Sequence, residues 1–339
     1  MSKKIKVAII GASGLSGKEL ISILEYSSLN ISQLHLFASS QSAGEKIAYK
    51  DEELTIKELK SPDDINVDLA FLATDSALAL DLAPKLRAKG IMVIDKSTAF
   101  REKELLIIPN VNGGLLSSVT QASIIASPNC VVVPLCEVLS PIHKKYGLLQ
   151  VIVSTYQAVS GAGKKAIDEL EKQVRDLFNL REIENKSFDK QIAFNILPNI
   201  PSFGELNDLL QTQEEEKIIQ ETKKILKLSD LLMQVTCVRV PVFNGHSMSV
   251  SVATEKTIDI EEVKSLLSSS LGIILQDDIK TICYPTPLES SGIDDVVVGR
   301  IRPNTAAKNG VSLFISADNL RVGASLNAAR IAERLYEEN

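Results

Sequence analysis

The sequence contains no tryptophan, few aromatic residues (4%) and only four cysteines among its 339 residues. The cysteines are far apart and form no CxxC pair, so we expect neither a disulfide framework nor a zinc or other metal site. No stretch approaches the roughly twenty consecutive apolar residues that span a bilayer. The net charge of −6 comes without a basic tract, which argues against nucleic acid as a partner. Residues 1–6 lack the apolar core of a signal peptide, so we expect a cytoplasmic protein.

The remaining composition is that of an ordinary globular protein, long enough for two domains. In the first part, apolar strand-like runs alternate with stretches of helical period, which is typical of a parallel sheet with crossover helices. We therefore predict an α/β fold with a Rossmann-like dinucleotide-binding domain over residues 1–129. Its expected strands are residues 5–10, 31–38, 67–74, 91–95 and 124–126, and its expected helices are residues 18–26 and 76–89.

The second part has longer strand-like runs and more highly charged helices. Its pattern favours an α+β domain with a mixed sheet over residues 130–318, mostly antiparallel and with helices on one face. Residues 319–339 contain a helical segment, 323–338, that we expect to pack back on the first domain. The expected strands are residues 149–156, 233–242, 247–254 and 311–317, and the expected helices begin near Gly163 and span residues 213–226.

A glycine-rich turn follows the first strand and opens the first helix. Gly11, Gly14 and Gly17 form a GxxGxxG variant of the dinucleotide fingerprint, in which the backbone approaches a pyrophosphate at a helix N-terminus. The alternative is a plain strand-to-helix turn. The predicted cofactor contacts in this turn are Gly11, Ala12, Ser13, Gly14, Leu15 and Ser16.

The end of the second strand bears on the choice of cofactor. NAD-specific sites usually carry Asp or Glu there, but the segment 37–41 reads FASSQ and has no carboxylate. Ser39 or Ser40 could donate to a 2′-phosphate, so NADP is favoured and NAD stays open. Alternatively, the two serines only cap a loop.

Cys130 lies in the segment 127–131, SPNCV, at an expected strand-to-helix junction. A helix N-terminus lowers a thiol pKa and favours the reactive thiolate, so Cys130 is a candidate nucleophile. The alternative is a cysteine that fills core space.

Two further polar residues stand out downstream. His246 lies between two strand-like runs, where it could be a general acid or base or a structural histidine. Arg239 interrupts an apolar run, so its burial would require a partner: a substrate carboxylate or an internal Asp or Glu.

Three other charged residues have weaker signals. Arg101 could bind phosphate or be a surface charge. Glu214 and Lys217 are one helical turn apart, so they could face one site or form a solvated ion pair.

Taken together, the chain resembles aspartate-β-semialdehyde dehydrogenases along essentially its whole length. The Gln157 and Arg239-to-His246 segments are the most specific part of this resemblance. The matching segments are 11–17, 42–44, 99–101, 128–130, 156–163, 193–195, 237–242, 245–246, 298–302, 318–321 and 323–324.

The resemblance implies a role for each matching residue. Cys130 would be the nucleophile, His246 the acid/base catalyst, and Gln157 would orient the acyl intermediate. The α-carboxylate of the substrate would be bound by Arg239 and its amino group by Glu214. Phosphate would be bound by Arg101, Asn129 and Lys217, and the nicotinamide half of the cofactor by Ser160, Gly161 and Asn319.

The implied reaction is the NADPH-dependent reductive dephosphorylation of L-β-aspartyl phosphate to L-aspartate-β-semialdehyde and phosphate. It would proceed through a thioester on Cys130 and would serve the biosynthesis of lysine, threonine, methionine and isoleucine, including the diaminopimelate branch in bacteria. The resemblance also implies a homodimer formed through the second domain.

Several positions depart from the family's usual pattern. Gln41 stands where many members have arginine, which weakens a strict NADP preference, and Lys96 replaces a common asparagine. Asn110 replaces a frequent glutamate, and residues 131–132 are Val-Val instead of Ser-Thr. Two alternatives stay open: an N-acetyl-γ-glutamyl-phosphate reductase and a non-catalytic paralogue that keeps the scaffold.

Overall fold

The computed structural model describes residues 4–119, 122–201 and 206–337. The chain divides into two compact units, Met1–Asn129 with Ala324–Asn339, and Cys130–Gly323. Each unit combines helices with its own β-sheet. No helix in the described ranges is long and apolar enough to cross a membrane.

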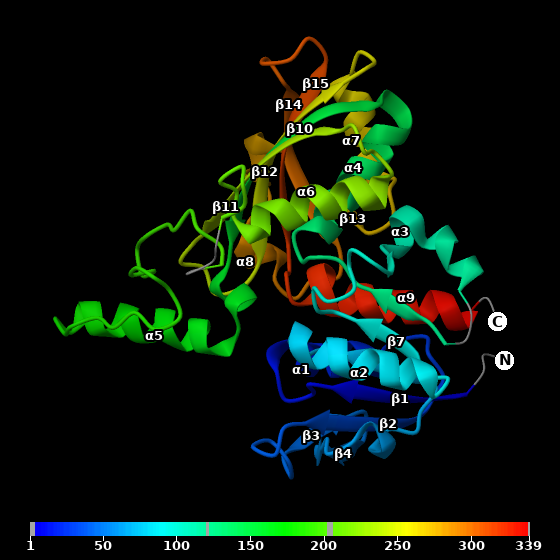
Figure 1. Cartoon of the computed structure of the whole chain (residues 1–339). Helices are drawn as coiled ribbons and strands as arrows, with labels where there is room; N and C mark the ends of the chain where they lie inside the picture. Colours follow the sequence, from blue (N-terminus) through cyan, green and yellow to red (C-terminus); the bar gives the residue numbers. More distant parts are fainter. Residues whose placement is uncertain (1–3, 120–121, 202–205, 338–339) are drawn as a thin grey trace. The chain divides into compact units, whose positions relative to one another are not determined.

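The first unit is built from short buried strands separated by helices, drawn in blue and cyan in Figure 1 with the C-terminal helix in red. Its elements are β1 (Ile5–Ile10), α1 (Leu15–Glu25), β2 (Ile31–Ala38), β3 (Lys46–Tyr49), β4 (Glu52–Thr55), β5 (Lys57–Glu58), β6 (Leu69–Leu72), α2 (Ser76–Ala88), β7 (Met92–Asp95), β8 (Leu105–Leu106), α3 (Pro109–Asn112), β9 (Ile124–Ala126) and α9 (Leu326–Glu337).

Seven of these strands form one parallel sheet in the order β5-β2-β1-β6-β7-β9-β8. All four residues of β6 and of β7 are buried, as expected for strands covered on both faces. The predicted Rossmann-like sheet is therefore confirmed. The hairpin β3-β4 was not predicted, because its short strands carry mixed polar and apolar residues.

The second unit has longer strands, drawn from green to orange in Figure 1. Its elements are α4 (Val132–Tyr146), β10 (Leu148–Gln157), α5 (Lys164–Phe178), α6 (Gln213–Leu226), β11 (Leu232–Arg239), β12 (His246–Thr254), α7 (Ile260–Ser268), β13 (Ile273–Leu275), α8 (Pro287–Ser290), β14 (Val296–Pro303) and β15 (Gly310–Ala317).

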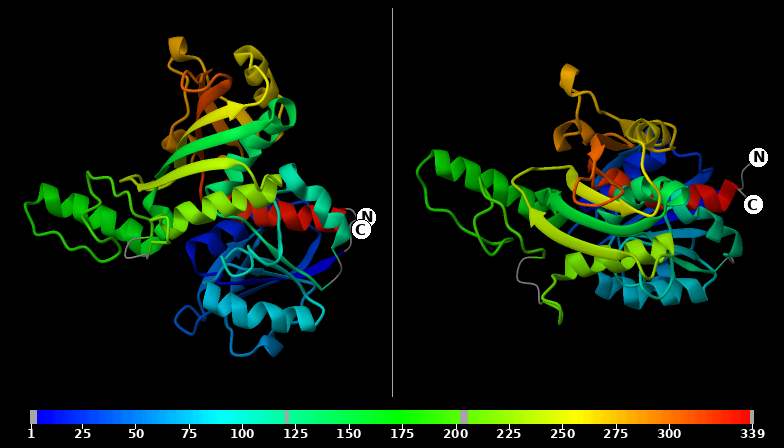
Figure 2. Two further views of the ribbon diagram at one scale, coloured as in Figure 1. Left: turned by 45° about the horizontal axis from the view of Figure 1, so that its top comes forward. Right: turned by 90° about the horizontal axis from the view of Figure 1, so that it is seen from above.

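Six strands of the second unit form a mixed sheet in the order β11-β10-β12-β15-β14-β13. The two outer pairs, β10 with β11 and β13 with β14, are parallel, and the other pairs are antiparallel. The curvature of this sheet is visible in Figure 2. The helix α4 packs against α6, α7 and β15, so these helices form a layer over one face. The predicted mixed sheet is confirmed.

The opposite face of β10 is more open to solvent. Val151, Val153 and Thr155 are buried, whereas the alternate residues Ile152 and Tyr156 are 41% and 39% exposed. The ring of Tyr156 stacks on Phe314 of β15 at a centroid distance of 6.1 Å. This face therefore presents apolar side chains on the surface of the chain.

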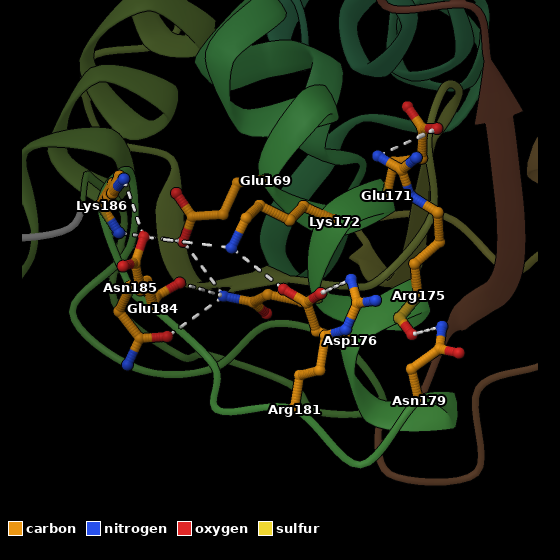
Figure 3. Close-up of polar contacts among 11 residues, drawn as sticks. Glu169, Glu171, Lys172, Arg175, Asp176, Asn179, Arg181, Glu184, Asn185 and Lys186 are labelled. Carbon is orange, nitrogen blue, oxygen red and sulfur yellow. Dashed lines mark hydrogen bonds and ion pairs between the residues drawn. The ribbon is translucent and has the colours of Figure 1, made fainter.

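The helix α5 extends away from the sheet together with the chain that follows it (Figures 1 and 2). Two side chains of α5 hold that following segment (Figure 3). The carboxylate of Glu169 accepts from the N–H groups of Lys186 and Ser187, and Gln173 Oε1 accepts from those of Ile192 and Ala193. Hydrogen bonds from its backbone to side chains of α5 therefore hold this segment against the helix, in place of backbone pairing between strands.

The segment 319–323 belongs to the second unit, although the sequence places the domain boundary between 318 and 319. Asp318 accepts from the N–H groups of Leu320 and Arg321 through its carboxylate, and from Gly323 N–H through its carbonyl oxygen at 3.1 Å. The guanidinium of Arg321 forms an ion pair with Asp294 at 2.6 Å. These bonds fix the segment to the second unit before α9 begins.

Candidate active site

Three strand ends of the second unit bring Gln157, Arg239 and His246 together. Gln157 is the last residue of β10 and pairs in register with Arg239, the last residue of β11. His246 is the first residue of β12, which runs antiparallel to β10 so that Ser247 pairs with Tyr156. The sequence predicts each of these residues separately, and the structure places them at one edge of the sheet.

The imidazole of His246 is fully enclosed, with 1% of the residue exposed. Its Nδ1 accepts a hydrogen bond from the backbone N–H of Ala158 at 3.1 Å. Its Nε2 is buried and has no hydrogen-bond partner among the described residues. Burial holds the pKa of His246 well below its usual value, the charge of Arg239 lowers it further, and the backbone of Gly245 opposes this shift. His246 is therefore neutral at neutral pH.

The guanidinium of Arg239 is also buried, with 6% of the residue exposed. Its Nη1 donates to the carbonyl oxygen of Ala158 at 2.6 Å. Burial lowers the pKa of Arg239, while the nearby acidic groups of Glu214 and Cys130 oppose that shift. The carboxylate of Glu214 is therefore an internal partner charge for Arg239. This is one of the two alternatives that the sequence left open for a buried arginine. The remaining donors of the guanidinium fork still suit a substrate carboxylate.

The amide of Gln157 is held by two acceptors. Its Nε2 donates to Thr155 Oγ1 at 3.3 Å and to Glu214 Oε1 at 3.4 Å. Glu214 is buried near the start of α6, and Lys217 follows one turn later, half-buried. Thr155 was missed by sequence reasoning, because nothing in the sequence distinguishes it from other strand threonines.

Cys130 lies two residues before α4 and is partly exposed. Its thiol interacts electrostatically with the guanidinium of Arg239. Gly323 packs directly against this cysteine, since a Cβ there would lie 2.9 Å from Cys130 Cβ and 2.6 Å from its carbonyl oxygen. By contrast, burial raises the pKa values of Cys136 and Cys237, which makes both unreactive.

The residues predicted to contact the nicotinamide lie beside Arg239 and His246. A Cβ on Gly161 would lie 3.0 Å from Arg239 Nη1 and 3.1 Å from His246 Nε2. Asn319 Nδ2 donates to Ser160 Oγ at 3.0 Å, and Asn319 Oδ1 accepts from Gly245 N–H at 3.0 Å. Ser160 and Asn319 therefore tie the loop after β10 to the loop before β12.

The other two predicted phosphate ligands, Arg101 and Asn129, belong to the first unit. Arg101 is half-buried, and its guanidinium donates to the carbonyl oxygens of Ser127 and Lys96, both at 3.0 Å. Asn129 is buried, with 6% exposed. Arg101 is thus more than a surface charge, since it holds the segment that precedes Cys130.

The glycine turn of the first unit has the geometry of a phosphate cradle. Gly11 has φ +88°, and a Cβ there would lie 2.3 Å from the carbonyl oxygen of Ala73. Gly14 is the N-cap of α1 and offers no side-chain cap, so the N–H groups of the first turn have no acceptor within the helix. The turn therefore fits the pyrophosphate of a dinucleotide. Ser39 and Ser40 are exposed directly after β2.

Comparison with known proteins identifies the family of the chain. Residues 6–128 match the family described as "Semialdehyde dehydrogenase, NAD binding domain", and residues 139–322 match "Semialdehyde dehydrogenase, dimerisation domain". The aspartate-semialdehyde dehydrogenase of Aquifex aeolicus is 39% identical over 98% of both chains. That of Bacillus subtilis is 40% identical and covers 100% of this chain and 99% of its own. The chain belongs to the aspartate-semialdehyde dehydrogenase family.

Solved structures of the family have the same fold. The crystal structure of aspartate semialdehyde dehydrogenase II from Vibrio cholerae matches with a TM-score of 0.94, at 34% identity and over 99% of both chains. The same Vibrio enzyme has been solved in a complex with ASA. Membership of the aspartate-semialdehyde dehydrogenase family makes this protein an oxidoreductase with an NAD(P)-binding Rossmann domain, and the resemblance read from the sequence is confirmed.

Proposed function

We propose that this protein catalyses the NADPH-dependent reductive dephosphorylation of L-β-aspartyl phosphate to L-aspartate-β-semialdehyde and phosphate. The observation that supports this most strongly is the enclosed group of Gln157, Arg239 and His246, with Cys130 near the guanidinium. This reaction would supply the biosynthesis of lysine, threonine, methionine and isoleucine, and the diaminopimelate branch in bacteria. Four cysteines without a disulfide suit the reducing cytoplasm.

The chemistry begins at Cys130. Its thiolate attacks the acyl carbon of the substrate, the bond from that carbon to the phosphate oxygen breaks, and a thioester forms as phosphate leaves. The position of Cys130, two residues before the N-terminus of α4, favours the thiolate that this step needs. Arg239 binds the α-carboxylate, Glu214 the amino group, and Arg101, Asn129 and Lys217 the phosphate.

The buried histidine serves the tetrahedral intermediates. Because Nδ1 of His246 accepts from Ala158 N–H, the proton of the neutral imidazole is on Nε2, for which the described part of the chain offers no hydrogen-bond partner. Nε2–H donates to the oxyanion that develops from the carbonyl oxygen and can transfer its proton there. Gln157 orients the acyl group beside it.

The glycine turn would hold the pyrophosphate of the cofactor, and Ser160, Gly161 and Asn319 would contact its nicotinamide half. Bound NADPH would supply the hydride for reduction of the thioester, and release of the thiolate would then give the aldehyde. The absence of a carboxylate after β2, where Ser39 and Ser40 stand, supports a preference for NADP over NAD.

We further propose that the protein is a homodimer formed through the second unit. The exposed apolar face of β10, with Ile152, Tyr156 and the stacked Phe314, supports this assembly. The match of residues 139–322 to a dimerisation domain agrees with it. Light scattering on the purified protein should give twice the mass of the chain, and a monomer would contradict the proposal.

Phosphate-dependent reduction of NADP by the purified protein tests the reaction. L-Aspartate-β-semialdehyde and N-acetylglutamate semialdehyde are offered in parallel, and both assays are repeated with NAD. We expect turnover of the aspartate compound with NADP. Turnover of the acetylated compound alone would identify an N-acetyl-γ-glutamyl-phosphate reductase. No turnover of either by folded protein would identify a non-catalytic paralogue.

A further inference from the structure

Lys96 is a basic residue that reaches the glycine turn from another strand. It directly follows β7, at the carboxyl edge of the parallel sheet, and its side chain is only partly exposed. Its Nζ donates to Ser325 Oγ at 2.6 Å and to the carbonyl oxygen of Ser16 at 3.3 Å, and it also contacts Ser16 Oγ. Ser16 is the second residue of α1. An ammonium group therefore lies against the first turn of the helix that follows the glycine turn.

These partners of Lys96 are neutral oxygens. Glu19 on α1 is the charged neighbour that stabilises the ammonium form. The nearby carboxylate of Asp95 accepts instead from the backbone and the hydroxyl of Ser97, and burial raises its pKa. Arg101 adds a second positive charge close by, because it donates to the carbonyl oxygen of Lys96. The surroundings thus suit an additional anion beside α1.

We propose that Lys96 is a cofactor-binding residue whose ammonium group pairs with the pyrophosphate of a bound dinucleotide. This inference rests on the proposed binding of NADPH or NADH by the glycine turn. The turn supplies backbone N–H groups and the helix dipole for the pyrophosphate, and Lys96 adds a full charge at the same helix end.

A consequence of this pairing is that cofactor binding takes up a proton. Burial lowers the pKa of Lys96 to about 7, and Glu19 opposes this shift. Above that pH the amine of the ligand-free protein is mostly neutral. A phosphate anion beside it favours the charged form and raises its pKa, so the complex binds more protons than its separate components. At pH 8 the uptake should approach about one proton per site.

Isothermal titration calorimetry measures both the affinity and the proton uptake. NADPH and NADH are each titrated into the full-length protein at pH 8, in two buffers with different ionisation enthalpies. NADH lacks the 2′-phosphate, so proton uptake on NADH binding cannot be due to protonation of that phosphate. We expect uptake with both dinucleotides, because both contain the pyrophosphate.

Three variants separate charge from structure. Lys96→Gln should weaken binding of NADPH and NADH by the same factor, about tenfold to a hundredfold, and abolish the uptake. Lys96→Arg keeps a permanent charge, so it should retain more affinity than Lys96→Gln but take up no proton. Lys18→Gln, which removes an exposed cation from the same helix, should leave the proton uptake at the wild-type value.

The outcomes distinguish this inference from the proposed function. Wild-type protein that binds dinucleotides without proton uptake, or a Lys96→Gln variant with unchanged affinity, would overturn the role of Lys96 and leave the enzyme assignment standing. A loss of affinity for NADPH alone would place Lys96 at the 2′-phosphate and also overturn it. Wild-type protein that binds neither dinucleotide would remove both the cofactor assignment and the inference.

Discussion

The backbone N–H of Ala158 donates to Nδ1 of His246, while the carbonyl oxygen of the same residue accepts from Arg239 Nη1. One peptide segment at the end of β10 thus orients both the imidazole and the guanidinium. The same segment fixes the histidine tautomer with its proton on Nε2. Both hydrogen bonds use the backbone of Ala158 and not its methyl side chain. Side-chain substitutions would therefore not reveal the role of this residue.

The protonation of His246 can be observed directly. We expect ¹⁵N-labelled histidine spectra to show a neutral imidazole with Nε2 protonated, and no titration of His246 near pH 6.5, because burial and Arg239 lower its pKa. The His246→Asn variant assigns the signal among the three histidines of the chain. A resonance of His246 that titrates near its ordinary pKa would contradict the buried neutral state.

Replacement of the nucleophile should separate activity from folding. Cys130→Ser should reduce turnover by at least about a thousandfold, because a hydroxyl is far less ionised than a thiol at neutral pH. Circular dichroism and the melting temperature should stay unchanged. Cys283→Ser is the matched control, a second partly exposed cysteine between β13 and α8, and should keep full turnover. Turnover of Cys130→Ser close to that of the wild type would refute the nucleophile.

Substrate binding should depend on the shape of Arg239 as well as on its charge. Arg239→Lys keeps a positive charge but loses the planar fork, so we expect the KM for the semialdehyde to rise about tenfold to a hundredfold. Arg302→Lys, at an exposed arginine on β14, serves as the control and should leave KM unaltered. An unchanged KM in Arg239→Lys would count against a carboxylate contact.

A single added methyl group tests how closely the loop after β10 approaches the catalytic groups. In Gly161→Ala the new Cβ would lie 3.0–3.1 Å from Arg239 Nη1 and His246 Nε2. Contacts this short force side chains to shift, so we expect kcat/KM to fall about tenfold or more. Gly114→Ala adds the same methyl group in open space and should retain wild-type kinetics. Wild-type kcat/KM in both variants would show that the loop after β10 shifts to accommodate the methyl group without disturbing Arg239 and His246.

Much of the fold could be predicted from the sequence because its strands have clear hydrophobic patterns. The strands β1, β2 and β9 have the predicted limits, as does the helix α6. The hairpin β3-β4 was missed because its strands mix polar and apolar residues, and β8 was missed because it is only two residues long. The helix α4 was foreseen only as a junction after Cys130, because a helix that is buried on almost every side shows no polar stripe.

The candidate site was predictable where side chains carry the chemistry. Arg239 and His246 attracted attention because a charged or ionisable residue next to apolar runs requires an explanation. The contributions of Ala158 and Thr155 were invisible, since backbone groups and hydroxyls acquire a role only through their position. Lys96 is an unusual residue in the sequence, but its contact with Ser16 depends on the fold of the first unit, which brings the residue after β7 to the start of α1.

The way in which Glu169 and Gln173 hold the chain after α5 has a consequence for local unfolding. Four backbone N–H groups of that segment depend on two carboxamide or carboxylate groups of one helix. When the turns of α5 that carry Glu169 and Gln173 open, all of these amides lose their acceptors together. The helix and residues 186–193 should therefore exchange hydrogen and become accessible to protease as one cooperative part. This part ends before Leu197, whose backbone pairs with Arg239 of β11.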